Sequence, residues 1–337
     1  MTQRFARVSG IGSALPERLV TNDDLAAMGV DTSDEWIAAR TGIRARRFVD
    51  EGDSASSLGS RAATIALDAA GLDPAAVDLT ICATFTGDQP LPSTASFIQA
   101  DLGITGAAFD LAAACAGFIY ATEVGAAQIA TGSAETVLVV GVEVMSRYLD
   151  LQDRTTCVLF GDGAGAAVLV PGTEPGVVGS VLENDGRHAH ILEIPAGGSR
   201  RPASAGTVES REHFVRMPDG REVFKRAVRG MSEASGRLLE KEGLGLDDID
   251  LLVPHQANAR IIKAVADRLS FPAERVYVDL ENVGNTSAAS VPIALDHAWR
   301  EGRLGPGDLV LTVAFGAGLS WGANVIRWTA ERPKETA

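Results

Sequence analysis

The stretch "GLDPAAVDLTI" at residues 71–81 returns in altered form as "GLGLDDIDLLV" at residues 243–253. Each copy begins with a glycine after a helical pattern and ends in an apolar run typical of a buried strand. The two copies lie 172 positions apart. Such self-similarity indicates that one helix-to-strand unit occurs twice in the chain. The sequence therefore predicts a duplicated architecture in which helices alternate with strands.

The surrounding sequence extends this pattern and favours the α/β class. Short apolar runs such as "TVLVVGVEV" alternate with helical patterns such as residues 60–70. The same offset aligns "SAETVLVVGVE" with "GPGDLVLTVAFG", and the helix expected after Cys115 with the one expected after Ser287. "PGTEPG" at residues 171–176 interrupts two apolar runs, so we expect two halves, residues 1–173 and 174–337, packed as one body.

Composition and charge narrow the class of protein. The 337 residues are 46% hydrophobic, which suits a globular chain with a large core. The net charge of −14 argues against binding to nucleic acid or to anionic membranes. Three cysteines without CxxC spacing predict neither a disulfide framework nor a zinc site. The amino terminus lacks the apolar core of a signal peptide and no apolar run reaches membrane-spanning length, so we expect a cytoplasmic protein.

Cys115 is the first candidate for chemistry. It lies in "LAAACAGFIY", after a predicted strand and at the predicted start of a helix. Unpaired N–H groups and the helix dipole at such a position favour a thiolate, which is the nucleophilic form. A small, inert core residue is the alternative, because cysteine is often buried and the flanking alanines and glycine also suit tight packing.

A nucleophilic cysteine needs polar partners, and two residues stand at suitable places. Among five histidines, His255 ends the predicted strand "IDLLVP", at the sheet edge where open α/β folds place their chemistry. Asn285, in "ENVGNTSAAS", occupies the corresponding turn of the second half. A structural histidine and a helix-capping asparagine are the alternatives.

Taken in order, these motifs resemble the β-ketoacyl-acyl carrier protein synthase III family, the thiolase-fold condensing enzymes that start type II fatty acid synthesis. The resemblance covers nearly the whole chain and rests on seven strings, "TSDEWIAARTGI", "AAACAGF", "FGDGAGAAVL", "EVFK", "PHQAN", "GNTSAAS" and "FGAGLSWG". It implies two α/β halves packed in α-β-α-β-α layers.

The resemblance also implies a reaction. Cys115 would take an acyl group from acyl-CoA, and His255 and Asn285 would hold the malonyl thioester carbonyl while carbon dioxide leaves. The resulting enolate would attack the acyl-cysteine and give a β-ketoacyl-acyl carrier protein. Two hydrogen-bond donors facing the developing oxyanion suit this step. Neither a metal nor a cofactor is expected.

Further roles follow from the resemblance alone. The backbone N–H groups of Cys115 and Ala317 would form an oxyanion hole, although the family often has glycine at the second position. Trp36 and Arg154 would sandwich the adenine of CoA, with Arg40 near its phosphates. Phe224 and Asn258 would complete the CoA contacts. Arg221 stands where the family commonly has asparagine, before the helix that carries "EVFK".

Partners are implied in the same way. An acidic malonyl-acyl carrier protein would dock on a basic rim formed by Lys225, Arg229, Arg260 and Lys263, for which two solvated helix faces are the alternative. The chain is expected to form a homodimer, with Leu91 reaching the acyl pocket of the partner subunit. Leucine there, in place of a bulky aromatic residue, would admit branched or longer primers.

Rival functions fit the sequence less well. A degradative thiolase needs a second cysteine in the carboxyl-terminal glycine turn, and "FGAGLSWG" has none. "GDGAGA" at residues 161–166 precedes an apolar strand instead of opening a helix, contrary to a dinucleotide-binding loop. An inactive subunit of a condensing enzyme would typically lack Cys115. An acyltransferase or condensing enzyme of secondary metabolism that uses the same acyl-cysteine stays open as the alternative.

Overall fold

Two β-sheets organise the computed structural model, which describes residues 4–331. The first sheet has five strands in the order β1-β7-β6-β4-β5, and the second has four in the order β8-β11-β10-β9. The strands of the first sheet are β1 (Phe5–Ala14), β4 (Leu79–Ala83), β5 (Ala107–Leu111), β6 (Val137–Glu143) and β7 (Gly163–Gly172). Those of the second are β8 (Val177–Asn184), β9 (Leu251–Pro254), β10 (Leu309–Gly316) and β11 (Ser320–Arg327).

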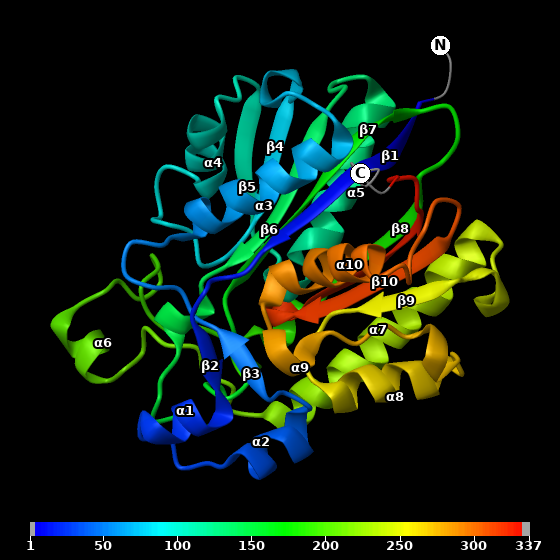
Figure 1. The fold of residues 1–337 in the computed structure, drawn as a ribbon. Helices are drawn as coiled ribbons and strands as arrows, with labels where there is room; N and C mark the ends of the chain where they lie inside the picture. The colour runs from blue at the N-terminus through cyan, green and yellow to red at the C-terminus, as the bar shows by residue number, and fades with distance from the viewer. Residues whose placement is uncertain (1–3, 332–337) are drawn as a thin grey trace, which may run out of the picture.

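Helices cover both sheets and fill the space between them. The helices are α3 (Ala55–Ala70), α4 (Thr94–Leu102), α5 (Gly117–Thr131), α7 (Gly220–Glu242), α8 (Ala259–Leu269) and α10 (Ser290–Arg300). Figure 1 shows α3 and α4 outside the first sheet, α5 and α10 between the sheets, and α7 and α8 outside the second. The α/β class and the α-β-α-β-α order of layers predicted from the sequence are confirmed.

Burial on both faces explains the apolar runs of the central strands. Every residue of β6 and of β10 is buried. A strand between two helical layers shows no alternation of polar and apolar residues, because both of its faces lie in the core. Glu143, at the end of β6, is therefore a buried carboxyl in an otherwise apolar strand.

The internal repeat has a direct structural counterpart. Gly71 ends α3 and Gly243 ends α7, both in the left-handed conformation, with φ of 64° and 69°. Glycine is favoured at this cap because a Cβ would be strained there. A short 3-10 turn and then a strand, β4 or β9, follow each cap. The first sheet draws its strands from residues 5–172 and the second from residues 177–327; the division into halves at residue 173 stays a prediction.

Smaller elements lie beyond the layers. They are β2 (Leu19–Thr21), β3 (Ala45–Arg47), α1 (Asn22–Ala27), α2 (Asp34–Thr41), α6 (Ala205–Glu209) and α9 (Leu280–Val283). In Figure 1, α1 and α2 lie together below the sheets, and α6 stands apart from them. None of the helices described is both long and apolar enough to cross a membrane.

Candidate active site

Cys115 lies at the junction of the two sheets. It belongs to the 3-10 turn Ala114–Ala116, between β5 and α5, and is 7% exposed. Ala114 has a φ of +45°, an uncommon conformation for a residue with a Cβ. Gly316, at the end of β10, packs so closely that a Cβ on it would lie 2.5 Å from the backbone nitrogen of Cys115. The turn that presents the thiol is thus held from both halves of the fold.

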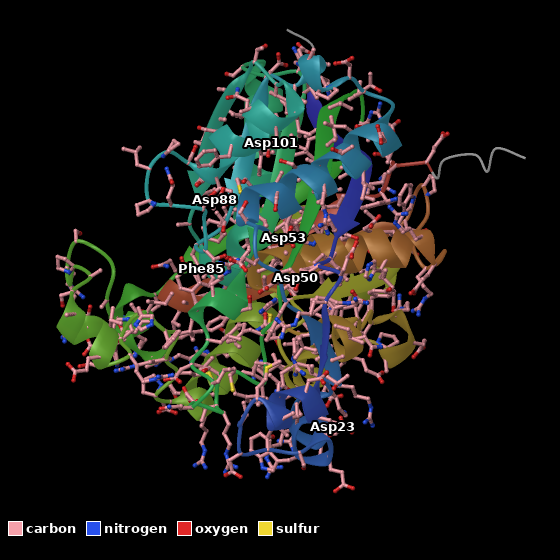
Figure 2. All side chains as sticks on the ribbon, turned by 60° about the vertical axis from the view of Figure 1, so that its left-hand side comes forward. Asp23, Asp50, Asp53, Phe85, Asp88 and Asp101 are labelled. Carbon is pink, nitrogen blue, oxygen red and sulfur yellow. The ribbon has the colours of Figure 1, made fainter. Side chains whose placement is uncertain are left out.

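An apolar cavity of about 400 Å³ opens at this thiol. Its wall includes the backbone turn at Cys115 together with Ala317 and Gly318 from the segment after β10. The remaining lining is mostly apolar: Phe85, Met145, Phe160, Leu192, Ile194 and Val215, with Glu193. In Figure 2, Phe85 lies on the segment that leaves β4, on the same loop as Asp88. The thiol therefore faces a space suited to an apolar chain.

Hydrogen bonds through Ser287 link Asn285 to Cys115. The backbone N–H of Ser287 donates to Oδ1 of Asn285 at 2.9 Å, and the Ser287 hydroxyl donates to Sγ of Cys115 at 3.3 Å. Ser287 has a φ of +49° and is fully buried. The sequence interpretation did not assign Ser287 a role, although the 172-residue repeat makes it the counterpart of Cys115.

His255 follows β9 and is fixed at both its backbone and its ring. Its backbone N–H donates to Val313 at 2.7 Å, and its Nδ1 lies 2.5 Å from Oγ of Ser290, the first residue of α10. Burial lowers the pKa of His255 to about 3, so the ring is neutral at physiological pH. The His255 ring and the Asn285 side chain are thus both held by hydrogen bonds to one short segment, through Ser290 and Ser287 respectively.

Glu143 is a second residue without a predicted role. Its Oε1 lies 3.3 Å from Oγ of Ser287, and its Oε2 accepts from the hydroxyl of Thr86 at 2.5 Å and the N–H of Thr86 at 3.1 Å. Burial raises the pKa of Glu143 to about 8, although these hydrogen bonds oppose the rise. The signal in the sequence is the single acidic residue within the apolar run "TVLVVGVEV".

The predicted preference of Cys115 for the thiolate is opposed by its burial. Burial raises the pKa of Cys115 to about 12. The hydrogen bond from Ser287 lowers it in part, and the charge of Glu143 raises it further. Burial therefore outweighs the hydrogen bonds that lower the pKa of Cys115, and the thiol is protonated at physiological pH.

The three residues expected around the adenine of CoA lie together, but in a closed arrangement. The guanidinium groups of Arg40 and Arg154 lie 4.3 Å and 5.0 Å from the centre of the Trp36 ring. A base stacked between Trp36 and Arg154 needs two contact distances, about 7 Å in all. Arg154 also donates to the backbone oxygen of Asp31 at 2.8 Å and to its carboxylate at 3.1 Å. An adenine between them therefore requires Arg154 to move.

Two more expected CoA contacts lie near this group. Asn258 caps α8 through Arg260, and its Nδ2 donates to the backbone oxygen of Arg40 at 3.2 Å. Phe224 is an exposed aromatic side chain on α7. Arg221 lies in the first turn of the same helix, whereas the sequence suggested a position before it.

The four residues of the expected basic rim are exposed on α7 and α8, two helices that pack against each other. Arg229 pairs with Glu233 at 2.9 Å, and Lys263 with Asp267 at 2.7 Å. Within residues 4–331, Lys225 and Arg260 form no ion pair. These two therefore carry the rim's uncompensated positive charge.

Leu91 lies on a surface loop between β4 and α4. At 83% exposure it is the most exposed of the large apolar side chains that the structure describes. Its expected contact with a partner subunit stays a prediction.

Comparisons of this chain with protein-family models and with curated proteins point to the same kind of enzyme. A family model described as 3-oxoacyl-[acyl-carrier-protein] synthase III matches residues 109–186, and its carboxyl-terminal counterpart matches residues 239–328. A β-ketoacyl-[acyl-carrier-protein] synthase III of Symbiobacterium thermophilum is 54% identical over 97% of this chain and 99% of its own length.

Solved structures give the same result. The 3-oxoacyl-(acyl carrier protein) synthase III of Pseudomonas aeruginosa aligns with a TM-score of 0.90 and 43% identity, over 98% of this chain and 100% of its own. A priming β-ketosynthase from a polyketide biosynthetic pathway aligns with a TM-score of 0.91 and 39% identity, over 98% of each chain. Because the relatives are this similar over nearly the whole chain, the chain belongs to the β-ketoacyl-acyl carrier protein synthase III family of condensing enzymes.

Proposed function

We propose that this acyltransferase joins an acyl-CoA primer to malonyl-acyl carrier protein through an acyl-Cys115 intermediate, giving a β-ketoacyl-acyl carrier protein. One observation carries the proposal. Cys115 and Ala317 line one apolar cavity, and Ser287 hydrogen-bonds to both Cys115 and Asn285. That cavity accommodates an acyl chain with its carbonyl carbon at the sulfur.

The first half-reaction is acyl transfer. The Cys115 sulfur attacks the thioester, and the oxyanion that forms is stabilised by the backbone N–H groups of Cys115 and Ala317. Gly316 supports this geometry, because its lack of a Cβ lets the end of β10 approach the Cys115 backbone. The acyl chain replaces water in the cavity, and CoA leaves.

The second half-reaction needs a neutral donor at His255. Ser290 Oγ accepts from the N–H of Gln256 at 3.4 Å, so its own proton is available to Nδ1 of His255. The ring proton then resides on Nε2, which donates to the malonyl thioester oxygen together with the Asn285 amide. Because burial lowers the pKa of His255, the ring is uncharged when it donates its Nε2 proton to the enolate oxygen.

The partners follow from family membership and from the exposed groups. Acyl-CoA would open the Trp36 and Arg154 stack and place its adenine there, with Arg40, Phe224 and Asn258 around it. The acidic carrier would dock on the rim on α7 and α8, where Lys225 and Arg260 are unpaired among the described residues. The protein would act as a homodimer, with the exposed Leu91 entering the partner subunit's acyl pocket. No resident cofactor takes part in these steps.

Intact-protein mass spectrometry tests the proposal. Wild type and Cys115→Ser would be incubated with a panel of acyl-CoAs, then with malonyl-acyl carrier protein. We expect an acyl mass on the wild type only, discharged as a β-ketoacyl carrier. The absence of acylation by any primer would overturn the role of Cys115.

The polyketide-priming neighbour favours one second candidate, a condensing enzyme or acyltransferase of secondary metabolism. Acylation of Cys115 without condensation onto malonyl-acyl carrier protein would favour this alternative. The primer that acylates fastest would also test Leu91, because a preference for acetyl-CoA alone contradicts the enlarged pocket.

A further inference from the structure

A chain of three buried polar groups leads from the nucleophile into the protein interior. Oγ of Ser287 lies 3.3 Å from Sγ of Cys115 and 3.3 Å from Oε1 of Glu143. Ser287 and Glu143 are fully buried. A hydroxyl has one proton and can donate it to only one of these neighbours. The direction of these two hydrogen bonds therefore depends on whether Cys115 or Glu143 holds the second proton.

Once Glu143 and Cys115 together have lost one proton, two arrangements fit the same heavy-atom positions. With a protonated thiol, Cys115 donates to Ser287, and Ser287 donates to the Glu143 carboxylate. With a thiolate, protonated Glu143 donates to Ser287, and Ser287 donates to the sulfur. Two protons, each moving along one hydrogen bond, convert one arrangement into the other. The buried negative charge moves but does not increase, so no second charge has to be desolvated.

Glu143 is held in a way that suits a proton acceptor. Two groups of Thr86 donate to its Oε2, which leaves Oε1 facing Ser287. Burial raises its pKa to about 8, and within residues 4–331 no cation pairs with it. The titratable groups that sense its charge are Cys115, Cys82 and Tyr148. Since that charge raises the pKa of Cys115, protonation of Glu143 and ionisation of the thiol favour each other.

We propose that Glu143, acting through Ser287, accepts the Cys115 proton when the thiol attacks a thioester and returns it when condensation releases the sulfur. This inference rests on the acyl-Cys115 chemistry proposed above. Ser287 is the group that contacts the reacting sulfur, and Glu143 is a positioning residue that holds the proton.

The proton balance closes over one cycle. In acylation, the S–H bond breaks, the proton joins Ser287, and the former Ser287 proton joins Glu143. The CoA thiolate leaves and takes a proton from solvent. In condensation, the enolate attacks the acyl carbonyl, the C–S bond breaks, and the Cys115 thiolate regains its proton from Glu143 through Ser287. The cycle consumes one solvent proton, as conversion of a malonyl carboxylate into carbon dioxide and a neutral ketone requires.

A purely electrostatic role for Glu143 predicts a different result for Ser287→Ala. The negative charge of Glu143 raises the pKa of Cys115 through space, and that effect does not need Ser287. If charge were its only effect, Ser287→Ala would alkylate as wild type does. If Ser287 passes the proton and then donates to the thiolate, Ser287→Ala alkylates more slowly.

The test is alkylation of Cys115 by iodoacetamide in the free protein, followed by peptide mass mapping from about pH 6 to about pH 10. For wild type we expect a rate that rises with a midpoint of about 8 and then levels off, because the pair titrates as a unit. Ser287→Ala should react about 10-fold more slowly at alkaline pH, because no hydroxyl then donates to the thiolate. In Glu143→Gln the midpoint near 8 should disappear and the rate should keep rising to about pH 10, because the titrating carboxyl is gone. Asp162→Asn, which also removes a buried carboxyl, is the matched control and should follow wild type.

A midpoint near 8 that persists in Glu143→Gln, or an unchanged profile in Ser287→Ala, would overturn the relay. If Glu143→Gln does not fold, Ser287→Ala decides the matter, because it leaves the carboxyl in place. Alkylation uses no acyl donor, so its outcome is separate from that of the proposed function. If wild type is acylated and both variants alkylate as wild type does, the relay alone is refuted. If alkylation follows the expected pH dependence in wild type and variants but no primer acylates Cys115, the proposed function alone is refuted.

Discussion

At the scale of the residue, the chemistry of this site depends on buried groups whose protonation is set by their surroundings. His255 is kept neutral by burial, Cys115 is kept protonated by burial, and Glu143 titrates near physiological pH for the same reason. Composition gives none of these states, because each depends on how far the group is removed from water.

His255 should be needed for condensation and not for acylation. His255→Ala removes one of two donors to the enolate oxygen, and we expect condensation to slow about 100-fold to 1,000-fold. The acyl-enzyme should still form at near the wild-type rate. Single-turnover mass spectrometry separates the two steps. Equal loss of both would mean that His255 positions the thiol and not the malonyl carbonyl.

Glu143 should also make stability depend on pH. Its pKa is about 8 in the folded protein and about 4.3 in an unfolded chain. As pH rises, Glu143 therefore loses its proton first in the unfolded state. Its contribution to the free energy of unfolding is fully present below about pH 4 and is lost as pH rises through 8, a change of about 5 kcal/mol. Glu143→Gln should flatten this slope. Denaturant unfolding of both proteins at several pH values measures it, and parallel slopes would contradict the assignment.

At the scale of the element, strand and helix ends from different parts of the chain build the site. β6 supplies Glu143, β9 leads to His255, and β10 ends at Gly316 against the turn of Cys115. Parallel strands bring their carboxyl ends to one edge of each sheet, and the stacking of the sheets brings the two edges together.

The close approach of β10 predicts a sensitive glycine. In Gly316→Ala the new Cβ would lie 2.5 Å from the Cys115 nitrogen, so the backbone must shift. We expect acylation to fall about 100-fold, because a displaced oxyanion donor stabilises the transition state poorly. Gly236→Ala in α7 is the control, since a Cβ there meets no other atom within 4 Å. Burst amplitude and rate with an acyl-CoA give the readout, and a normal burst in Gly316→Ala would refute the packing argument.

At the scale of the whole molecule, the net charge of −14 opposes an acidic carrier, so a local cationic surface has to guide it. Arg229 and Lys263 are largely neutralised by acidic neighbours on their own helices, whereas Lys225 and Arg260 are not. We therefore expect docking to depend unequally on the four residues.

Charge reversal tests this inequality. Lys225→Glu should raise KM for malonyl-acyl carrier protein about tenfold at low salt and leave the acylation rate by acyl-CoA unchanged. Lys241→Glu, at the other end of α7, is the control and should have little effect. Steady-state kinetics at two salt concentrations distinguish them, and equal effects of the two variants would exclude a local docking surface.

Short-range pattern in the sequence was enough for the fold class. The apolar runs, the glycine caps at Gly71 and Gly243, and the repeat between them predicted two related α/β units, because a residue's preference for strand, helix or cap depends on its neighbours in the chain. The motif strings marked Cys115, His255 and Asn285, and the structure anchors the last two to one segment of the second half.

Only the tertiary structure decided how these residues are linked and protonated. Ser287 and Glu143 join Cys115 from positions 172 and 28 residues away, through contacts that no local pattern encodes. The closed stack of Trp36 and Arg154 and the raised pKa of the Cys115 thiol were likewise invisible in the sequence. The reason is physical: hydrogen bonding, desolvation and stacking act over a few ångströms in space, and only the folded chain brings these groups within that range.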